Sequence, residues 1–177
     1  MLASCVNTLQ DHKAQRIALL SDSHGQLAAP LIEQLAGVDL IVHAGDLGAG
    51  AVLRTLESIA PVCAIAGNND TAGQWPAGEA EICAQLPAVF RVELDGGVLV
   101  AIHGHQFPAV ATRHARLRAA FPDAQCIVYG HSHRRCIDLQ MSPWVVNPGA
   151  SGVARAFGGA GGLLLTVSSQ IWQLATL

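Results

Sequence analysis

The fold class is decided by the stretch Arg16-Ile-Ala-Leu-Leu-Ser-Asp-Ser-His-Gly25, a short apolar run that ends in a polar loop. The segments 39–46 and 62–70 repeat this arrangement further along the chain. Between these runs, apolar residues recur at helical spacing over 26–36 and 51–59, which predicts two helices. Strands that alternate with helices indicate βαβ units and a parallel sheet, and therefore an α/β protein.

In the second half of the chain, strand and helix signals no longer alternate regularly, and the pattern predicts further strands with one more helix. Val89–Leu94 and Val98–Ile102 flank Asp95-Gly-Gly97, which is a hairpin signal. The segment 108–121 is expected to be helical, while 71–87, which is rich in Gly, Pro and Ala, is expected to be loop with some helix. Shorter strands are expected over 126–129, 135–139, 144–146, 163–167 and 171–174.

Length and composition favour one compact domain. The chain has 177 residues, of which 51% are apolar and 13% are charged, so it can bury a sizeable core. We expect a single domain over 16–177 after a loose leader over 1–15. The net charge of −3 provides no electrostatic footprint for nucleic acid, which disfavours a nucleic-acid partner and a nuclease activity.

Cysteine usage and hydropathy indicate the cytoplasm. The five cysteines are odd in number and form no Cys-x-x-Cys pair, so we interpret them as reduced thiols and not as a disulfide framework. No apolar run approaches the length of a membrane span, and residues 1–15 lack the layout of a signal peptide. We therefore expect a cytoplasmic protein with no membrane partner.

Metal-ligating side chains follow the ends of the expected strands. Because ligands of open α/β sheets bind outside the carboxyl ends of the strands, we expect these side chains to share one edge of the fold. Carboxylate and amide oxygens combined with imidazole nitrogens suit Mn, Fe, Zn, Ni or Co, whereas calcium takes oxygen ligands alone. The residues concerned are Asp22, His24, Asp46, Asn68, His103, His105, His131 and His133.

Other histidines and a basic cluster have simpler interpretations. His12 and His114 do not follow a strand and are assigned to the surface, and His43 lies within a strand, which indicates a structural or supporting role. The cluster formed by His114 with its neighbouring arginines is interpreted as the solvated face of a helix. A cationic rim for an anionic substrate is the alternative. The arginines are Arg113, Arg116 and Arg118.

Two motifs of other enzyme classes are incomplete. Gly45-x-x-Gly48-x-Gly50 departs from the spacing of a dinucleotide-binding loop, and Asp46 within it would repel a pyrophosphate. Ser23 lies beside His24, but no Gly-x-Ser-x-Gly elbow is present to expose a nucleophilic serine. Both segments are better explained as loops that bind metal.

Five loops, taken in order, resemble those of the calcineurin-like metallophosphoesterases, and they are most similar to the small single-domain phosphodiesterase branch. The loops are Asp22-Ser-His24, Gly45-Asp46, Gly67-Asn-Asn-Asp70, His103-Gly-His105 and Gly130-His-Ser-His133, and Asn147-Pro-Gly-Ala-Ser151 resembles a further loop of that branch. The resemblance covers the chain from about Arg16 to near its end. It implies a four-layer α/β/β/α sandwich of two mixed β-sheets flanked by helices.

The resemblance also implies two divalent transition-metal ions at the carboxyl edge of the sheets. One ion would take Asp22, His24, Asp46 and His133, and the other would take Asp46, Asn68, His103 and His131, so that Asp46 bridges them. Manganese is the favoured metal, with Fe, Ni, Zn and Co as alternatives. A metal-bound hydroxide would then attack the phosphorus of a small phosphate ester.

One position departs from the family pattern. Many relatives have a His after the ligand Asn, and that His protonates the leaving group. Here the position is Asn69, which cannot act as an acid. His105 is the nearest candidate replacement as a catalytic residue, although a substrate contact or a supporting role would also explain it. Asp70 is expected to hold its loop or to orient a ligand.

The expected activity is hydrolysis of phosphodiesters or phosphomonoesters. The alternative is a metal-binding scaffold of the same fold with little catalysis, which the complete set of seven candidate ligands disfavours. A homo-oligomer is left open. Arg134 or Arg135 is expected near the mouth of the site, and only one should face the substrate because successive strand residues point to opposite faces.

Overall fold

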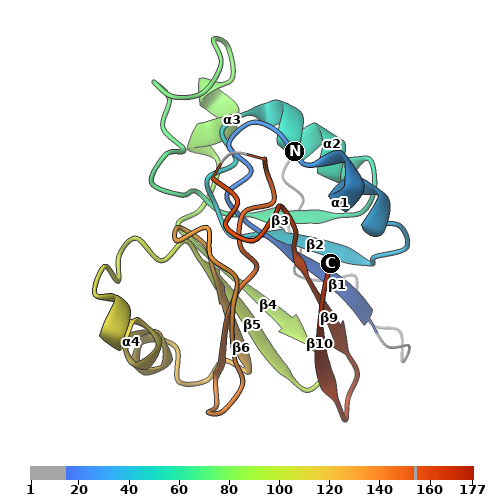
Figure 1. The fold of residues 1–177 in the computed structure, drawn as a ribbon, viewed down its shortest axis with the longest axis vertical. Helices are drawn as coiled ribbons and strands as arrows, with labels where there is room; N and C mark the ends of the chain where they lie inside the picture. Colours follow the sequence, from blue (N-terminus) through green and yellow to red (C-terminus); the bar gives the residue numbers. More distant parts are fainter. Residues whose placement is uncertain (1–14, 154) are drawn as a thin grey trace.

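The computed structural model describes residues 15–153 and 155–177, and Figure 1 shows their arrangement. One five-stranded sheet has the strand order β10-β9-β1-β2-β3. Its strands are β1 (Gln15–Leu20), β2 (Leu40–His43), β3 (Val62–Ala64), β9 (Leu163–Val167) and β10 (Trp172–Thr176). The pairs β1–β2 and β2–β3 are parallel, whereas β9 runs antiparallel to β1 and to β10, so the sheet is mixed.

The other five-stranded sheet has the order β4-β5-β6-β8-β7. Its strands are β4 (Val89–Leu94), β5 (Gly97–Ile102), β6 (Cys126–Tyr129), β7 (Cys136–Asp138) and β8 (Trp144–Asn147). The strands β5, β6 and β8 are parallel, and the edge strands β4 and β7 are antiparallel to their neighbours. The strands β4 and β5 form the hairpin that the sequence predicts around Asp95-Gly-Gly97.

Helices flank the sheets and complete the four layers. They are α1 (Ala29–Gln34), α2 (Gly50–Glu57), α3 (Ala80–Ala84), the 3₁₀ turn η1 (Val110–Thr112) and α4 (Arg113–Ala120). Figure 1 shows α1 and α2 covering the sheet that contains β1, while α4 lies beside the sheet that contains β6. The expected sandwich of two mixed sheets flanked by helices is confirmed.

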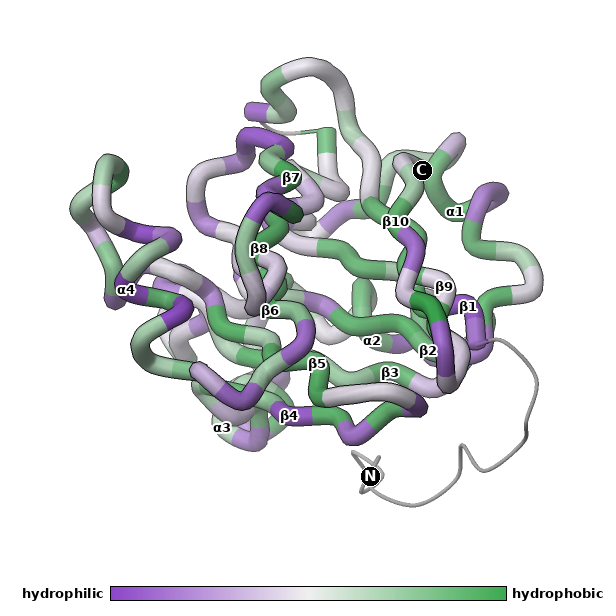
Figure 2. Tube along the Cα trace, turned by 90° about the horizontal axis from the view of Figure 1, so that it is seen from below, coloured by the Kyte–Doolittle hydropathy of each residue, from purple (hydrophilic) through white to green (hydrophobic). Residues whose placement is uncertain are grey.

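The strand β1 separates two of the three hydrophobic cores. Because successive side chains of a strand point to opposite faces, Ala18 and Leu20 pack toward α1 and α2, while Ile17 and Leu19 pack between the two sheets. A third core lies between the second sheet and α4, where Leu117 is fully buried. Figure 2 shows hydrophobic residues concentrated in the strands, in contrast to the hydrophilic stretches of α4.

Element boundaries differ from the expected ones mainly at two helices. The helix expected over 26–36 is confined to α1, which starts beside Pro30 because proline is favoured in a first helical turn and disfavoured further in. The helix expected over 108–121 is divided into η1 and α4. Of the expected leader, only Gln15 is described, and it begins β1. No helix in the described part of the chain is long and apolar enough to cross a membrane.

Candidate metal centre

Five of the seven candidate ligands share an unusual backbone conformation. Five residues have positive φ angles of 46° to 68°, in the left-handed region that residues other than glycine rarely adopt. Such a conformation costs about 1–3 kcal/mol for each residue and clusters at functional sites. Among the described non-glycine residues, only Arg155 shares it with these five. The five are Asp22, His24, Asp46, His131 and His133.

Glycines allow the loops that carry these residues to approach one another. A Cβ atom at Gly67 would lie 2.1 Å from Oδ1 of Asp46, and one at Gly130 would lie 1.8 Å from Oγ of Ser21. A side chain at position 67 would collide with the loop after β2, and a side chain at position 130 would collide with the loop after β1. The glycines therefore let loops from both sheets converge on one point.

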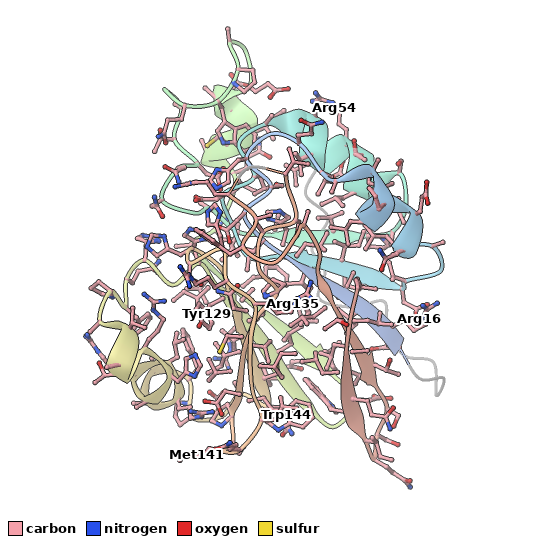
Figure 3. The ribbon with its side chains drawn as sticks, in the orientation of Figure 1. Arg16, Arg54, Tyr129, Arg135, Met141 and Trp144 are labelled. Atoms are coloured by element: carbon pink, nitrogen blue, oxygen red, sulfur yellow. The ribbon has the colours of Figure 1, made fainter. Side chains whose placement is uncertain are left out.

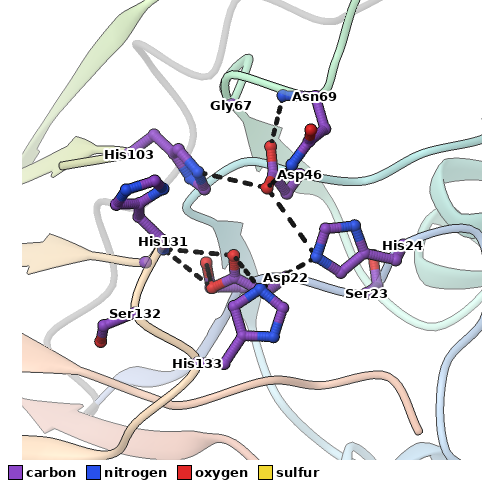
Figure 4. Close-up of polar contacts among 12 residues, drawn as sticks. Asp22, Ser23, His24, Asp46, Gly67, Asn69, His103, His131, Ser132 and His133 are labelled. Atoms are coloured by element: carbon purple, nitrogen blue, oxygen red, sulfur yellow. Dashed lines mark hydrogen bonds and ion pairs between the residues drawn. The ribbon is translucent and has the colours of Figure 1, made fainter. Parts of the chain in front are cut away.

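Asp22, His24, Asp46 and His133 form one cluster, in which a set of ligand atoms lies within 4.8 Å of one another (Figure 4). The Nε2 atoms of His24 and His133 are 3.0 Å apart, and the two rings are stacked with centroids 4.8 Å apart. Nε2 of His133 lies 3.3 Å from Oδ1 of Asp22, and Nε2 of His24 lies 3.8 Å from Oδ2 of Asp46. Two imidazole nitrogens and two carboxylates that face a common point match the donor set of a transition-metal ion.

A second group of candidate ligands surrounds the other side of Asp46. Nε2 of His103 lies 3.4 Å from Oδ2 of Asp46 and 3.2 Å from Oδ1 of Asn68. The His131 ring is 5.4 Å from the His103 ring, between centroids. Nδ1 of His103 donates to the carbonyl oxygen of Ala44 at 2.8 Å, which leaves Nε2 to face Asp46 and Asn68.

Asn69 has a role that the sequence did not indicate. Its backbone N–H donates to Oδ1 of Asp46 at 2.9 Å, and its side-chain Nδ2 donates to Oδ2 of the same carboxylate at 2.6 Å. These two bonds hold the Asp46 carboxylate between the two groups of histidines. Loop 67–70 therefore positions the Asp46 carboxylate. The sequence alone shows only that Asn69 replaces the general acid of many relatives, and it carries no signal for this positioning role.

Burial and neighbouring charges set the protonation of the metal-free cluster. Burial raises the pKa of Asp22 from 3.8 to about 7. Burial would also raise the pKa of Asp46, but the hydrogen bond and charge of His103, together with the bonds from Asn69, hold it well below its usual value. Burial lowers the pKa of His24 and of His131, so both favour the neutral form that binds metal.

Asp22 and the neighbouring loop are held by residues at the ends of β1 and β2. Oγ of Ser21 donates to Oδ2 of Asp22 at 2.7 Å, and the backbone N–H of His131 donates to the same oxygen at 3.0 Å. The buried His43 lies 3.0 Å from Oγ of Ser23 through its Nε2 atom, which agrees with the expected structural role. Burial lowers the pKa of His43 to about 4.

Asp70 holds its loop as expected. Its carboxylate accepts hydrogen bonds from the backbone N–H groups of Leu47, Gly48 and Gly67 at 3.2, 3.0 and 2.8 Å, and from Nε1 of Trp75 at 2.9 Å. One buried carboxylate therefore joins the loop after β2 to the loop after β3. This arrangement fixes Asp46 and Asn69 relative to each other.

The remaining histidines lie in different surroundings. His105 has its ring 5.5 Å from that of His103 and 6.2 Å from that of His131, and its buried Nδ1 atom makes no hydrogen bond with any described residue. His114 does not join the cluster, as expected, but it is not a solvated residue. Its Nδ1 lies 2.8 Å from Oδ2 of Asp138 and its Nε2 lies 3.0 Å from the Tyr129 hydroxyl. His12 lies outside the described residues.

The interpretation of the basic cluster on α4 as a solvated face is wrong for most of its members. Arg113 is only 6% exposed, and the Arg118 side chain is 11% exposed. Only Arg116 is exposed. The reason is that one side of α4 packs on the second sheet, where Arg118 forms an ion pair with Asp138 and its Nε donates a hydrogen bond to the carbonyl oxygen of Pro143.

Two cavities adjoin the cluster. The larger has a volume of about 850 Å³ and extends from His131 and Ser132 toward α4 and β7, with Arg134 in its wall. Arg135, which is labelled in Figure 3, is not in that wall and donates to the carbonyl oxygens of Pro148 and Leu177. Of this pair, the expected arginine beside the site is therefore Arg134. The smaller cavity has about 350 Å³ and is lined by His24, Gly48, Asn69, Gln74 and Arg155.

Comparisons with known proteins identify the family of the chain. Residues 16–170 match the calcineurin-like phosphoesterase superfamily domain. A probable metallophosphoesterase of Methanothermobacter thermautotrophicus is 27% identical over 144 residues, which is 78% of each chain.

Among solved structures, Vacuolar Protein Sorting 29 of Cryptosporidium parvum is similar with a TM-score of 0.73 and 16% identity, over 93% of this chain and 97% of that one. A structure described as a novel archaeal phosphodiesterase is similar with a TM-score of 0.67 and 20% identity, over 92% of this chain and all of that one. These two likenesses concern the fold, whereas the family model extends over most of the chain and includes all five candidate loops. The chain belongs to the calcineurin-like phosphoesterase superfamily.

Proposed function

We propose that the protein is a hydrolase that uses two divalent metal ions to cleave phosphate esters, with phosphodiesters as the preferred substrates. One observation carries the proposal: four of the candidate ligands converge within 4.8 Å, and three more surround the opposite side of Asp46. Buried carboxylates and imidazoles that face a common point are costly unless they bind a cation.

The donor set supports two adjacent ions. Asp22, His24 and His133 would hold one ion, and Asn68, His103 and His131 would hold the other, with Asp46 between them. Divalent ions in such a centre supply Lewis acidity, which activates water as the nucleophile and offsets the charge of the phosphoryl group. The mixed oxygen and nitrogen ligands suit Mn first, with Fe, Ni, Zn and Co as alternatives. One fold neighbour, Vps29 of Entamoeba histolytica, is described in complex with Zn²⁺.

The chain's own residues orient the ligands and shape proton transfer. Asn69 and Asp70 fix the Asp46 loop, and Ser21 fixes Asp22. Asn69 cannot protonate a leaving group. We assign protonation of the leaving group to His105, whose pKa is lowered by burial and by the charge of His103. A histidine of this kind is mostly neutral near neutral pH, so only a small fraction is protonated and able to donate to the leaving group, which favours substrates with good leaving groups.

The competing function is a metal-binding scaffold of the same fold. The likeness to Vacuolar Protein Sorting 29 is the observation behind it. The scaffold function gives no reason for a complete ligand set held by supporting bonds from Asn69 and Asp70. We therefore favour catalysis on a small phosphate ester in the cytoplasm, where buried thiols such as Cys83 and Cys126 would stay reduced.

The proposal is tested on purified protein that has been treated with a chelator and reloaded with Mn²⁺. Hydrolysis of bis(p-nitrophenyl) phosphate and p-nitrophenyl phosphate should appear with the metal and vanish with the chelator, and the diester should be the better substrate. A scaffold would bind the metal and hydrolyse neither ester. Equal activity with and without metal would contradict the proposal altogether.

A further inference from the structure

The larger cavity lies beside the candidate metal centre and has a wall in common with it. His131 contributes to both, and Ser132 follows it along the cavity. The rest of the wall comes from η1, the start of α4, the end of β6, Arg134 and β7. Its volume of about 850 Å³ is within the range of small-molecule sites, so it can hold more than a phosphoryl group.

The charged groups in the cavity wall favour an anion. Arg113 and Arg134 line the cavity, and Asp138 is the one carboxylate among the residues that line it. Asp138 is already engaged, because its carboxylate lies 2.9 Å from Nη2 of Arg118 and 2.8 Å from Nδ1 of His114. The charges of Arg113 and Arg134 are therefore not balanced by the carboxylate beside them.

The two arginines are held in place by neutral groups. Nε of Arg113 donates to the carbonyl oxygen of Phe107 at 2.8 Å, and its guanidinium lies 5.7 Å from the centre of the Tyr129 ring. The guanidinium of Arg134 lies 4.6 Å from the centre of the Phe157 ring. Within residues 15–153 and 155–177, neither arginine forms an ion pair with a carboxylate. Ring stacking fixes a guanidinium and leaves its N–H donors able to bind oxygen anions.

We propose that this cavity binds the organic arm of the phosphate ester and selects an arm that carries an anionic oxygen group of its own, with Arg134 and Arg113 as the recognising residues. The inference rests on the proposed function, since it places the scissile phosphate at the metal centre. His114 lies in the same wall, fixed between Asp138 and Tyr129, and reports on the occupancy of the cavity.

The first test compares two p-nitrophenyl diesters that share a leaving group and differ only in the other arm, 3-carboxyphenyl or 3-carbamoylphenyl. Because one charge-assisted contact is roughly twice as strong as a neutral one, we expect kcat/KM to favour the carboxylate arm by about tenfold. Arg134→Ala should abolish this preference. The matched control is Arg135→Ala, which removes the neighbouring arginine outside the cavity and should leave the preference unchanged. Equal ratios in wild type and Arg134→Ala would overturn the assignment.

The second test does not depend on catalysis. Chelator-treated protein is titrated with 3-hydroxybenzoate and, separately, with 3-hydroxybenzamide, while the ring resonances of His114 are followed by NMR. The benzoate alone should shift them, and Arg134→Ala should weaken that shift. A phosphonate probe of the same size then tells whether carboxylate or phosphate is the better anion.

The two tests separate this inference from the proposed function. If the metal-loaded protein hydrolyses no ester while the benzoate still shifts His114, the proposed function fails and the anion site remains. If both diesters are hydrolysed equally well and His114 does not respond, the anion site fails and the proposed function remains.

Discussion

The side of the site that faces the proposed ions (the metal-facing side) and the side that lines the larger cavity (the cavity-facing side) are built in different ways. The metal-facing side consists of short side chains at strand ends, with Asp22, Asp46 and His103 at most 1% exposed. The cavity-facing side is formed by η1, the start of α4, the end of β6 and the 131–138 segment, and it includes exposed residues such as Val110 and Arg134. The first side is held rigidly by buried backbone, and the second is held by stacking and ion pairs.

This difference has consequences for tolerance to change. A ligand held by buried loops cannot be replaced by a neighbour, because glycines and left-handed residues leave no room for the loops to adjust. An arginine stacked on an aromatic ring at the surface can be removed while the fold remains. We therefore expect changes on the metal-facing side to abolish function and changes on the cavity-facing side to alter specificity.

The largest effect should follow from Asp46→Asn. The change removes the carboxylate between the two groups of candidate ligands, so both proposed ions would lose a charged partner. Because loss of even a supporting residue costs about 10–100-fold, we expect kcat/KM to fall by more than about 100-fold and metal content to fall with it. Asp123→Asn, at an exposed carboxylate paired with Arg91, is the control that should change neither quantity. Normal turnover by the Asp46→Asn variant would contradict the assignment of Asp46 as a metal ligand.

The next effect concerns leaving groups. A general acid contributes about 10²–10⁴-fold, and alkyl leaving groups need it far more than aryl ones. With Asn69 in place, we expect aryl esters to be strongly preferred over alkyl esters, and Asn69→His to narrow the gap while also losing the bond to Asp46. The measurement is kcat/KM against leaving-group pKa.

His105 provides the control for this prediction. If His105 already acts as a full general acid, kcat/KM of the wild type will vary little with leaving-group pKa. His105→Ala will then make kcat/KM fall steeply as the leaving-group pKa rises. That result would contradict the expected preference for aryl esters. A steep wild-type plot that His105→Ala leaves unchanged would instead assign His105 to a structural or substrate contact.

A smaller and graded effect is expected from pH. In the metal-free protein, burial raises the pKa of Asp22 to about 7, so a metal ion must displace a proton from this carboxyl below that pH. Metal affinity should therefore fall by about tenfold or more for each unit below about pH 7, because at least one proton is released on binding. Titration calorimetry in two buffers of different ionisation enthalpy measures the released proton. Constant affinity over this range would mean that Asp22 does not bind the ion.

The smallest effects should distinguish the two sides of α4. Arg118 donates to the Pro143 carbonyl at 2.8 Å and pairs with Asp138, so Arg118→Ala should lower the free energy of unfolding by about 1–3 kcal/mol. Arg116 is exposed, and Arg116→Ala should change the free energy of unfolding by about 0.5 kcal/mol or less. Urea denaturation with an unchanged m-value measures both. Equal midpoints for the two variants would contradict the buried role of Arg118.

The sequence predicts the strand order along the chain and the metal-facing residues because these signals are local. An apolar run followed within three residues by Asp22 or Asp46 identifies both the strand and the position of its polar end. The surroundings of α4 could not be predicted in this way. His114 and Asp138 are 24 residues apart and meet only because α4 packs on the second sheet. The bond from Asn69 to Asp46 likewise joins two loops that no local pattern connects.

The central claim is that two ions share Asp46 at the edge of both sheets. The most direct test is a crystal structure of the Mn²⁺-loaded protein with anomalous scattering at the metal edge. Two anomalous peaks about 3.5–4 Å apart, one on each side of the Asp46 carboxylate, are the predicted result. One peak at a different position, or none at full loading, would contradict the account.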